Sequence, residues 1–139
     1  MNAADTNVFV YYFDPTEPVK QAKAVALFRT LITATPSTVM PWQVLGEFAK
    51  QMRSWQDKGR ITRAEVLSHV SAVRSFFPLV MPTPNVLDLA MSLTSRHSLS
   101  HWDSMILGAC IEAGVTTLYT EDMGAPTNFD GIQLVNPFV

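Results

Sequence analysis

The chain has 139 residues, of which 47% are hydrophobic and 16% are charged, and its formal net charge is −2. This length suits a single domain over residues 1–139 that buries its own core. The composition excludes a disordered chain, and no run approaches the ~20 apolar residues that a membrane helix requires. The absence of a secretory-signal pattern and the single cysteine, Cys110, favour a cytoplasmic protein without an internal disulfide.

The spacing of apolar residues predicts short strands alternating with longer helices. In chain order, the predicted elements are a strand at 3–5, a helix at 6–13, a helix at 16–33, a strand at 37–40, a helix from 41 to the break at 59, a helix from 62 to about 77, a strand at 79–81, a helix at 85–96, a helix at 102–113, a strand at 115–120 and a strand at 132–135.

Local signals support several of these helices. Pro41 suits a first helical turn, and Thr62 with Glu65 has the spacing of a capping box. Gly114 suits the end of the apolar helix before the strand at 115–120. In the helix at 16–33, apolar residues from Val19 to Leu31 recur at near-helical spacing. In the helix at 85–96, Leu89 and Leu93 are predicted to face the core.

Strands separated by helices predict an α/β fold. Crossovers between parallel strands are right-handed and place helices on both faces of a sheet. We therefore expect a three-layer α/β/α sandwich with a short, mostly parallel central sheet. In such a fold, ligands bind beyond the carboxyl ends of the strands.

Acidic residues stand at the positions where this fold would place a ligand. Asp5 ends the first predicted strand, and Asp122 follows the strand at 115–120. Asp103 lies in the first turn of an otherwise apolar helix, and Glu47 lies in the first half of its helix. Four carboxylates in one cleft would repel one another unless a cation lay among them. Such an oxygen-rich site suits Mg²⁺ or Mn²⁺.

The segments around these acids resemble the motifs of PIN-domain ribonucleases, and their order and spacing are similar to those of the VapC-like toxins of type II toxin–antitoxin systems. The resemblance covers nearly the whole chain and rests on four segments: Asp5-Thr6-Asn7-Val8-Phe9-Val10, Leu45-Gly46-Glu47-Phe48, His101-Trp102-Asp103-Ser104-Met105-Ile106-Leu107 and Leu118-Tyr119-Thr120-Glu121-Asp122.

The resemblance implies an endoribonuclease that hydrolyses RNA phosphodiester bonds with metal-activated water, often in transfer or ribosomal RNA. It also implies a cognate antitoxin protein as a partner. The chain itself would usually form a homodimer and would not associate with a membrane. Carried onto this chain, the metal ligands and catalytic residues would be Asp5, Glu47, Asp103 and Asp122. Thr120, with Thr6 and Asn7, would orient these acids through hydrogen bonds.

Each acid also has a structural interpretation. Asp5 suits the N-cap of the helix that follows it, and Asp103 suits a capping box with Ser100. Glu47 suits a solvated edge of its helix, and Asp122 suits a turn. Glu121 offers a second carboxylate beside Asp122. The alternative function is a catalytically silent PIN-like domain that binds RNA or protein.

Other residues leave both structural and functional interpretations open. The basic residues of one stretch would either steer RNA phosphates or cover a solvated helical hairpin: Lys50, Arg53, Lys58, Arg60 and Arg63.

Trp42, Trp55 and Trp102 would either stack on bases or pack in a core or interface. His97 and His101 are conceivable general bases but favour a surface or supporting role. Cys110, in an apolar helix, suggests an inert core residue.

Overall fold

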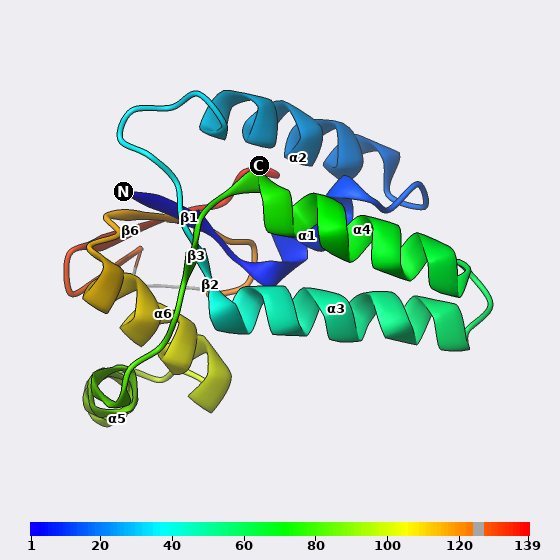
Figure 1. Ribbon diagram of the computed structural model, residues 1–139. Helices are drawn as coiled ribbons and strands as arrows, with labels where there is room; N and C mark the ends of the chain where they lie inside the picture. Colours follow the sequence, from blue (N-terminus) through cyan, green and yellow to red (C-terminus); the bar gives the residue numbers. More distant parts are fainter. Residues whose placement is uncertain (124–126) are drawn as a thin grey trace.

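The computed structural model describes residues 1–123 and 127–139, and within them the chain forms six helices and six strands (Figure 1). In chain order these are β1 (Asn2–Ala4), α1 (Thr6–Tyr12), α2 (Pro18–Leu31), β2 (Met40–Pro41), α3 (Trp42–Asp57), α4 (Arg63–Phe76), β3 (Leu79–Val80), α5 (Pro84–Arg96), α6 (His101–Ala113), β4 (Thr117–Tyr119), β5 (Asn128–Phe129) and β6 (Ile132–Val135).

The strands form a mostly parallel sheet, as the sequence predicts. In the order β1-β4-β6-β5, the first three strands are parallel and β5 runs antiparallel to β6. β2 and β3 form a parallel pair beside β1. Asn2 joins them to β1: its N–H donates to Ser37 O at 2.8 Å, and its carbonyl accepts from Val39 N at 2.9 Å.

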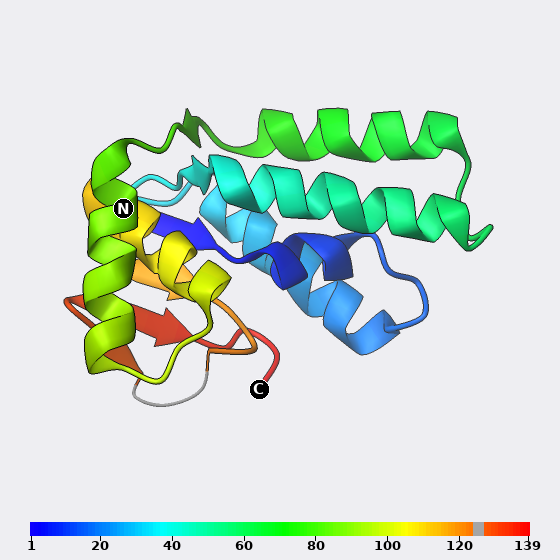
Figure 2. The same ribbon diagram turned by 90° about the horizontal axis from the view of Figure 1, so that it is seen from below.

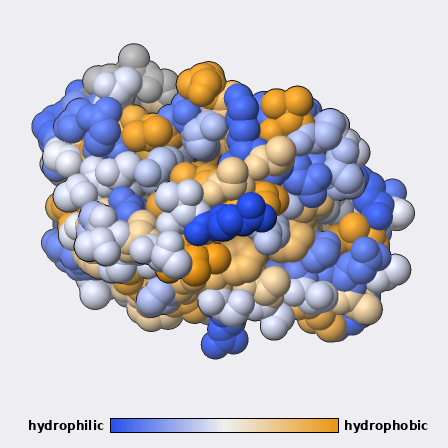
Figure 3. Space-filling model, turned by 90° about the horizontal axis from the view of Figure 1, so that it is seen from above, coloured by the Kyte–Doolittle hydropathy of each residue, from blue (hydrophilic) through white to orange (hydrophobic). Residues whose placement is uncertain are grey.

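Helices cover both faces of this sheet, which confirms the predicted three-layer α/β/α sandwich. α2 lies on one face and α5 with α6 on the other, while α3 and α4 form an antiparallel pair that extends past the carboxyl ends of the parallel strands (Figures 1 and 2). On the α2 side, hydrophobic and hydrophilic residues are interspersed over the surface (Figure 3). No helix within the described residues is long and apolar enough to cross a bilayer.

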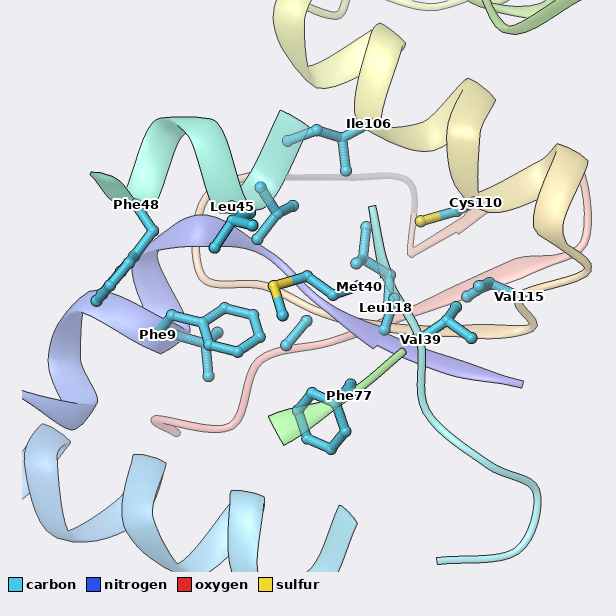
Figure 4. Packing of buried hydrophobic residues seen from close by; sticks show 14 of the residues in the cluster. Phe9, Val39, Met40, Leu45, Phe48, Phe77, Ile106, Cys110, Val115 and Leu118 are labelled. Atoms are coloured by element: carbon cyan, nitrogen blue, oxygen red, sulfur yellow. The ribbon is translucent and has the colours of Figure 1, made fainter. Parts of the chain in front are cut away.

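The core lies between these layers, where side chains of α1, α3 and α6 meet those of the strands (Figure 4). Phe9 of α1 stacks on Phe28 of α2 with ring centroids 4.7 Å apart. Cys110 of α6 is fully buried, and this burial raises the pKa of its thiol to about 12. The thiol is therefore protonated and inert at neutral pH, as predicted.

Helix ends follow the local signals. Thr62 and Glu65 form the predicted capping box, and the Ser100 side chain caps α6. Gly114 follows α6 in the left-handed conformation, with φ of 79°. These caps satisfy backbone groups that a helix end leaves without partners.

The apolar spacing in α2 and α5 does not by itself locate the buried face of each helix. Val19 is 67% exposed, and α2 instead buries Ala24, Phe28 and Leu31. In α5, Leu93 is buried as predicted, whereas Leu89 is half-buried, because the helix buries Val86, Ala90 and Leu93. Both helices carry apolar residues on more than one side, so spacing alone admits two rotations about the axis.

Several predicted boundaries also change: the strand predicted at 3–5 is β1 at Asn2–Ala4, and the strand predicted at 115–120 is β4 at Thr117–Tyr119. The strand predicted at 37–40 is β2 at Met40–Pro41, with Thr38 bridged to Asn2. Pro41 is the N-cap residue of α3 in extended conformation and does not belong to its first turn.

β5 and its hairpin to β6 are absent from the sequence prediction. Phe129 pairs with Ile132, and the two-residue turn between them has positive φ at both Asp130 (50°) and Gly131 (92°). An Asp-Gly pair is a strong signal for this type of tight hairpin turn, so the sequence carried the information.

Gly108 allows α5 and α6 to pack closely. A Cβ atom at this position would lie 2.8 Å from Val86 O and 3.3 Å from Ala90 N, both backbone atoms that have little freedom to move. We expect Gly108→Ala to lower the free energy of unfolding by about 2 kcal/mol, measured by urea denaturation. Gly46→Ala is the control: it meets nothing within 4 Å and should gain up to about 1 kcal/mol from helix propensity. Equal stabilities for both variants would contradict this account.

Candidate active site

The four predicted carboxylates lie around one cavity of about 1030 Å³. Asp5 follows β1, Glu47 comes from α3, Asp103 from the first turn of α6, and Asp122 from the segment after β4. Thr6 and Asn7 also line this cavity, and Thr120 lies buried behind Asp5. The structure thus brings together all seven residues that the sequence analysis selects.

Asp5 lines the cavity and is held in place by hydrogen bonds of its main chain and side chain. Its N–H donates to Tyr119 O at 2.8 Å, which ties the end of β1 to β4. Its Oδ1 accepts from Thr6 N at 2.7 Å and caps α1, and its Oδ2 accepts from Thr120 Oγ1 at 2.9 Å. The capping role therefore occurs, but each oxygen keeps a further lone pair.

Burial dominates the electrostatics of Asp5. The residue is only 6% exposed, and this desolvation raises its pKa to about 6. The two hydrogen bonds favour the carboxylate and oppose this shift, whereas the negative charges of Asp103 and Glu47 add to it. A buried carboxylate with like charges nearby is stabilised by a cation.

Glu47 is oriented by α1 and by its own helix. Its Oε2 accepts from Thr6 Oγ1 at 2.9 Å, and its Oε1 accepts from Gln43 Nε2 at 2.5 Å. Gln43 Nε2 also donates to Trp102 O at 3.0 Å, so one amide links α3 to α6. The sequence analysis missed Gln43, although its place one helical turn before Glu47 is a usable signal.

Asp103 lies in the first turn of α6 and lines the cavity with the other acids. Its backbone N donates to Ser100 Oγ at 3.2 Å, so Ser100 caps the helix through the main chain of Asp103. Partial burial raises the pKa of Asp103, and the charges of Glu47 and Asp122 raise it further. Capping and membership of the acidic group are therefore compatible.

Two adjacent carboxylates, Glu121 and Asp122, take different directions. Asp122 Oδ2 accepts from Asn7 Nδ2 at 2.7 Å and lines the cavity. Glu121 accepts from Tyr11 Oη at 3.0 Å and forms an ion pair with Lys20 at 2.7 Å. Glu121 is thus committed to a contact with α1 and α2.

The residues present fit a hard divalent cation by chemistry, although they are not preassembled around one. Among residues 1–123 and 127–139, no three Asp, Glu, His or Cys side chains are already grouped closely enough to hold a metal ion. The donors around the cavity are oxygens, which suits Mg²⁺ or Mn²⁺. Asn7 Oδ1 is buried without a hydrogen-bond partner in the described residues, so it can accept from water on such an ion.

Part of the basic stretch reaches the cavity. Its five residues are all exposed, as expected of a solvated hairpin: Lys50, Arg53, Lys58, Arg60 and Arg63. Lys50 and Arg60 line the cavity, and Arg60 bonds Asp14 Oδ1 at 3.0 Å and lies over the Trp55 ring at 4.2 Å.

The histidines lie outside the acidic group. His97 is half-buried and its ring makes a T-shaped contact with the Phe129 ring, and His101 is exposed at the start of α6. Neither lines the cavity. These positions agree with the surface or supporting roles that the sequence favours.

Comparison with known proteins identifies the family. Residues 3–126 match the family model of the PIN domain. The chain belongs to the PIN domain family. None of the curated proteins matches it significantly.

Several solved structures share this fold. VapC20 of Mycobacterium tuberculosis, a toxin that cleaves the sarcin–ricin loop, is 16% identical, with a TM-score of 0.64 over 88% of this chain and 90% of that one. A toxin–antitoxin complex from Klebsiella pneumoniae gives 0.68 at 15% identity, covering 99% and 98%. VapBC2 of Rickettsia felis, bound to promoter DNA, gives 0.63 at 15% identity, covering 97% of each chain. At these identities the likeness concerns the fold.

Proposed function

We propose that this PIN-domain chain is a divalent-metal-dependent endoribonuclease and the toxin of a type II toxin–antitoxin pair. The observation that carries the proposal is the convergence of Asp5, Glu47, Asp103 and Asp122 from separate elements onto one cavity. Burial raises the pKa values of Asp5 and Asp103, and the charges of the other carboxylates raise them further. A structural role for each acid alone gives no reason for all of them to meet.

In this proposal the four carboxylates hold Mg²⁺ or Mn²⁺. When bound, the metal activates water for attack on a phosphodiester and offsets charge on the phosphoryl oxygens. The chain's own contribution is orientation: Thr120 and Thr6 N fix both oxygens of Asp5, and Thr6 Oγ1 with Gln43 fixes both oxygens of Glu47. Asn7 fixes one oxygen of Asp122. Such supporting bonds keep ligands in place and are costly to lose.

The proposed partners are RNA, with transfer or ribosomal RNA as the first candidates, and a cognate antitoxin. The structural neighbours support this choice, since one is a toxin that cleaves the sarcin–ricin loop and others come from toxin–antitoxin complexes. We further propose one catalytic domain over residues 1–139, a cytoplasmic location and a homodimer. The oligomeric state is measurable by light scattering on the purified chain.

The direct test incubates the purified protein with total cellular RNA in Mg²⁺, Mn²⁺ or chelator. We expect discrete fragments that require the metal, because a hydrolytic site of this kind produces defined ends. Asp103→Asn is run in parallel and should give no fragments, since it removes one metal ligand while keeping the helix cap made by its backbone N–H.

Cleavage that persists in chelator or in Asp103→Asn would point to a contaminating nuclease. A protein freed of any bound antitoxin that cleaves no RNA with either metal would refute the catalytic proposal and favour the silent binding domain. Circular dichroism of both proteins shows that the comparison is made between folded chains.

A further inference from the structure

Two of the three tryptophans are exposed in a position that core packing does not explain. Trp42, the first residue of α3, is 48% exposed, and Trp102, in the first turn of α6, is 61% exposed. Trp55 is 3% exposed. Burial of a large apolar area is the usual reason for a tryptophan in a small domain. Only Trp55 meets that description.

Both exposed indoles belong to the cavity that holds the acidic residues. Trp42 and Trp102 line it together with Asp103 and Glu47. Trp102 immediately precedes Asp103 in the first turn of α6, and Trp42 immediately precedes Gln43. The Gln43 amide bonds both the Glu47 carboxylate and the Trp102 carbonyl, so the backbones that carry the two indoles are fixed relative to the carboxylates.

The rest of the cavity indicates what these indoles would contact. Lys50 is exposed, lines the cavity and makes no ion pair with residues of the part that the structure describes. The cavity therefore combines a cation-binding acidic end, flat aromatic surfaces and a free ammonium group. A divalent metal and an ammonium group bind phosphates, and indole rings stack on the faces of bases.

We propose that Trp42 and Trp102 stack on unpaired bases beside the scissile phosphate and so select single-stranded or looped RNA over duplex. This proposal rests on the proposed ribonuclease function and assigns two specificity-determining residues to it. In a duplex both faces of each base are covered by neighbouring bases, so an indole gains contact only with a base that has left the stack. The two tryptophans would therefore favour single-stranded or looped RNA over duplex RNA.

The test measures binding separately from cleavage. In an Asp103→Asn background with Mg²⁺, fluorescence anisotropy follows a labelled single-stranded RNA of about 10 nucleotides and the same RNA annealed to its complement. We expect Trp42→Ala and Trp102→Ala each to weaken single-strand binding about tenfold or more, the usual cost of one lost stacking contact. Binding of the duplex should change little. Trp42→Phe and Trp102→Phe should retain most of the affinity.

A kinetic measurement in the otherwise native chain tests the same roles. The alanine variants should raise the KM for single-stranded RNA more than they lower kcat, because the stacking contact is made in the bound state as well as in the transition state. Leu67→Ala is the control: Leu67 is an exposed apolar residue of α4 that does not line the cavity, so the ratio of single-strand to duplex affinity should stay unchanged.

The outcomes separate this inference from the proposed function. A native chain that cleaves RNA while its alanine variants keep native affinity and KM would overturn the stacking role and leave the nuclease standing. If the native chain cleaves no RNA but the alanine variants selectively lose single-strand binding, the stacking role is supported and the proposed catalysis is refuted. Equal losses for single strand and duplex, or no RNA binding at all, would overturn the inference and leave the indoles as a surface for a protein partner.

Discussion

Asp5→Asn is expected to stabilise the metal-free protein by about 3 kcal/mol above pH 6. Burial raises the pKa of Asp5 from 3.8 to about 6 in the folded chain, a shift of about two units at 1.36 kcal/mol each. Asparagine is neutral and still accepts from Thr6 N as the cap of α1. Its Nδ2 can donate to Thr120 Oγ1, so the contact also survives.

The sign of the pH dependence follows from the raised pKa. Below about pH 4 the carboxyl is protonated in the folded and unfolded chains, and the two proteins should be nearly equal in stability. As the pH rises toward 6, the unfolded chain ionises first, and the native protein loses the stabilisation that the protonated group provided. The difference between variant and native protein therefore grows from pH 4 to pH 6 and then remains constant. Urea denaturation at a series of pH values measures it.

Divalent metal should reverse this order. A ligand that binds only the folded chain stabilises it by about 4.1 kcal/mol at one thousand times its dissociation constant, which exceeds the advantage of about 3 kcal/mol that the variant has without metal. Mn²⁺ should therefore raise the melting temperature of the native protein, whereas Asp5→Asn should respond little and should lose RNA cleavage. Asp88→Asn, on the exposed side of α5, is the control and should change neither property. A destabilised Asp5→Asn variant at pH 8 would show that Asp5 is a structural residue first.

Much of the fold was predictable from local sequence because its helix ends carry their own signals. The capping box at Thr62 and Glu65, the cap at Ser100 and the left-handed Gly114 depend on residues within one or two turns. The order of strands in the sheet, unlike the helix ends, does not depend on residues that are close in sequence. β1 pairs with β4, more than a hundred residues further along the chain, and nothing within the four-residue stretch around β1 specifies that partner. The predicted layers therefore came from the general rules for parallel sheets.

The same distinction between local and long-range information applies to the candidate site. The acids could be selected from the sequence because they recur beside strand ends and helix starts, and because their segments resemble one family. The contacts of Gln43 with Trp102 and of Lys20 with Glu121 could not, since each depends on how a helix is placed against a segment distant in the sequence. α2 shows the limit: Val19 belongs to its near-helical apolar pattern, yet the side chain is 67% exposed. Side-chain contacts between helices require that rotation to be known.

The ion pair of Lys20 leads to a prediction on the two adjacent carboxylates after β4. Asp122→Asn should lower the rate of metal-dependent RNA cleavage about a hundredfold or more, because it removes a charged oxygen ligand beside Asn7. Glu121→Gln should leave the rate within about threefold of native. It loses only a partly exposed ion pair with Lys20, and such pairs contribute about 1 kcal/mol or less.

The comparison is sharp because the two substitutions are adjacent, each removes one charge and each keeps the shape of its side chain. Removing one negative charge weakens the repulsion between the protein and RNA in both variants alike. This effect therefore cannot produce the expected difference between them. Initial rates on one defined RNA, with Mg²⁺ and with Mn²⁺, provide the measurement. A Glu121→Gln variant as impaired as Asp122→Asn would mean that the anchor to Tyr11 and Lys20 sets the position of the whole segment, and that Asp122 depends on it. A fully active Asp122→Asn variant would remove this residue from the proposed metal site and leave Asp5, Glu47 and Asp103 to hold the ion.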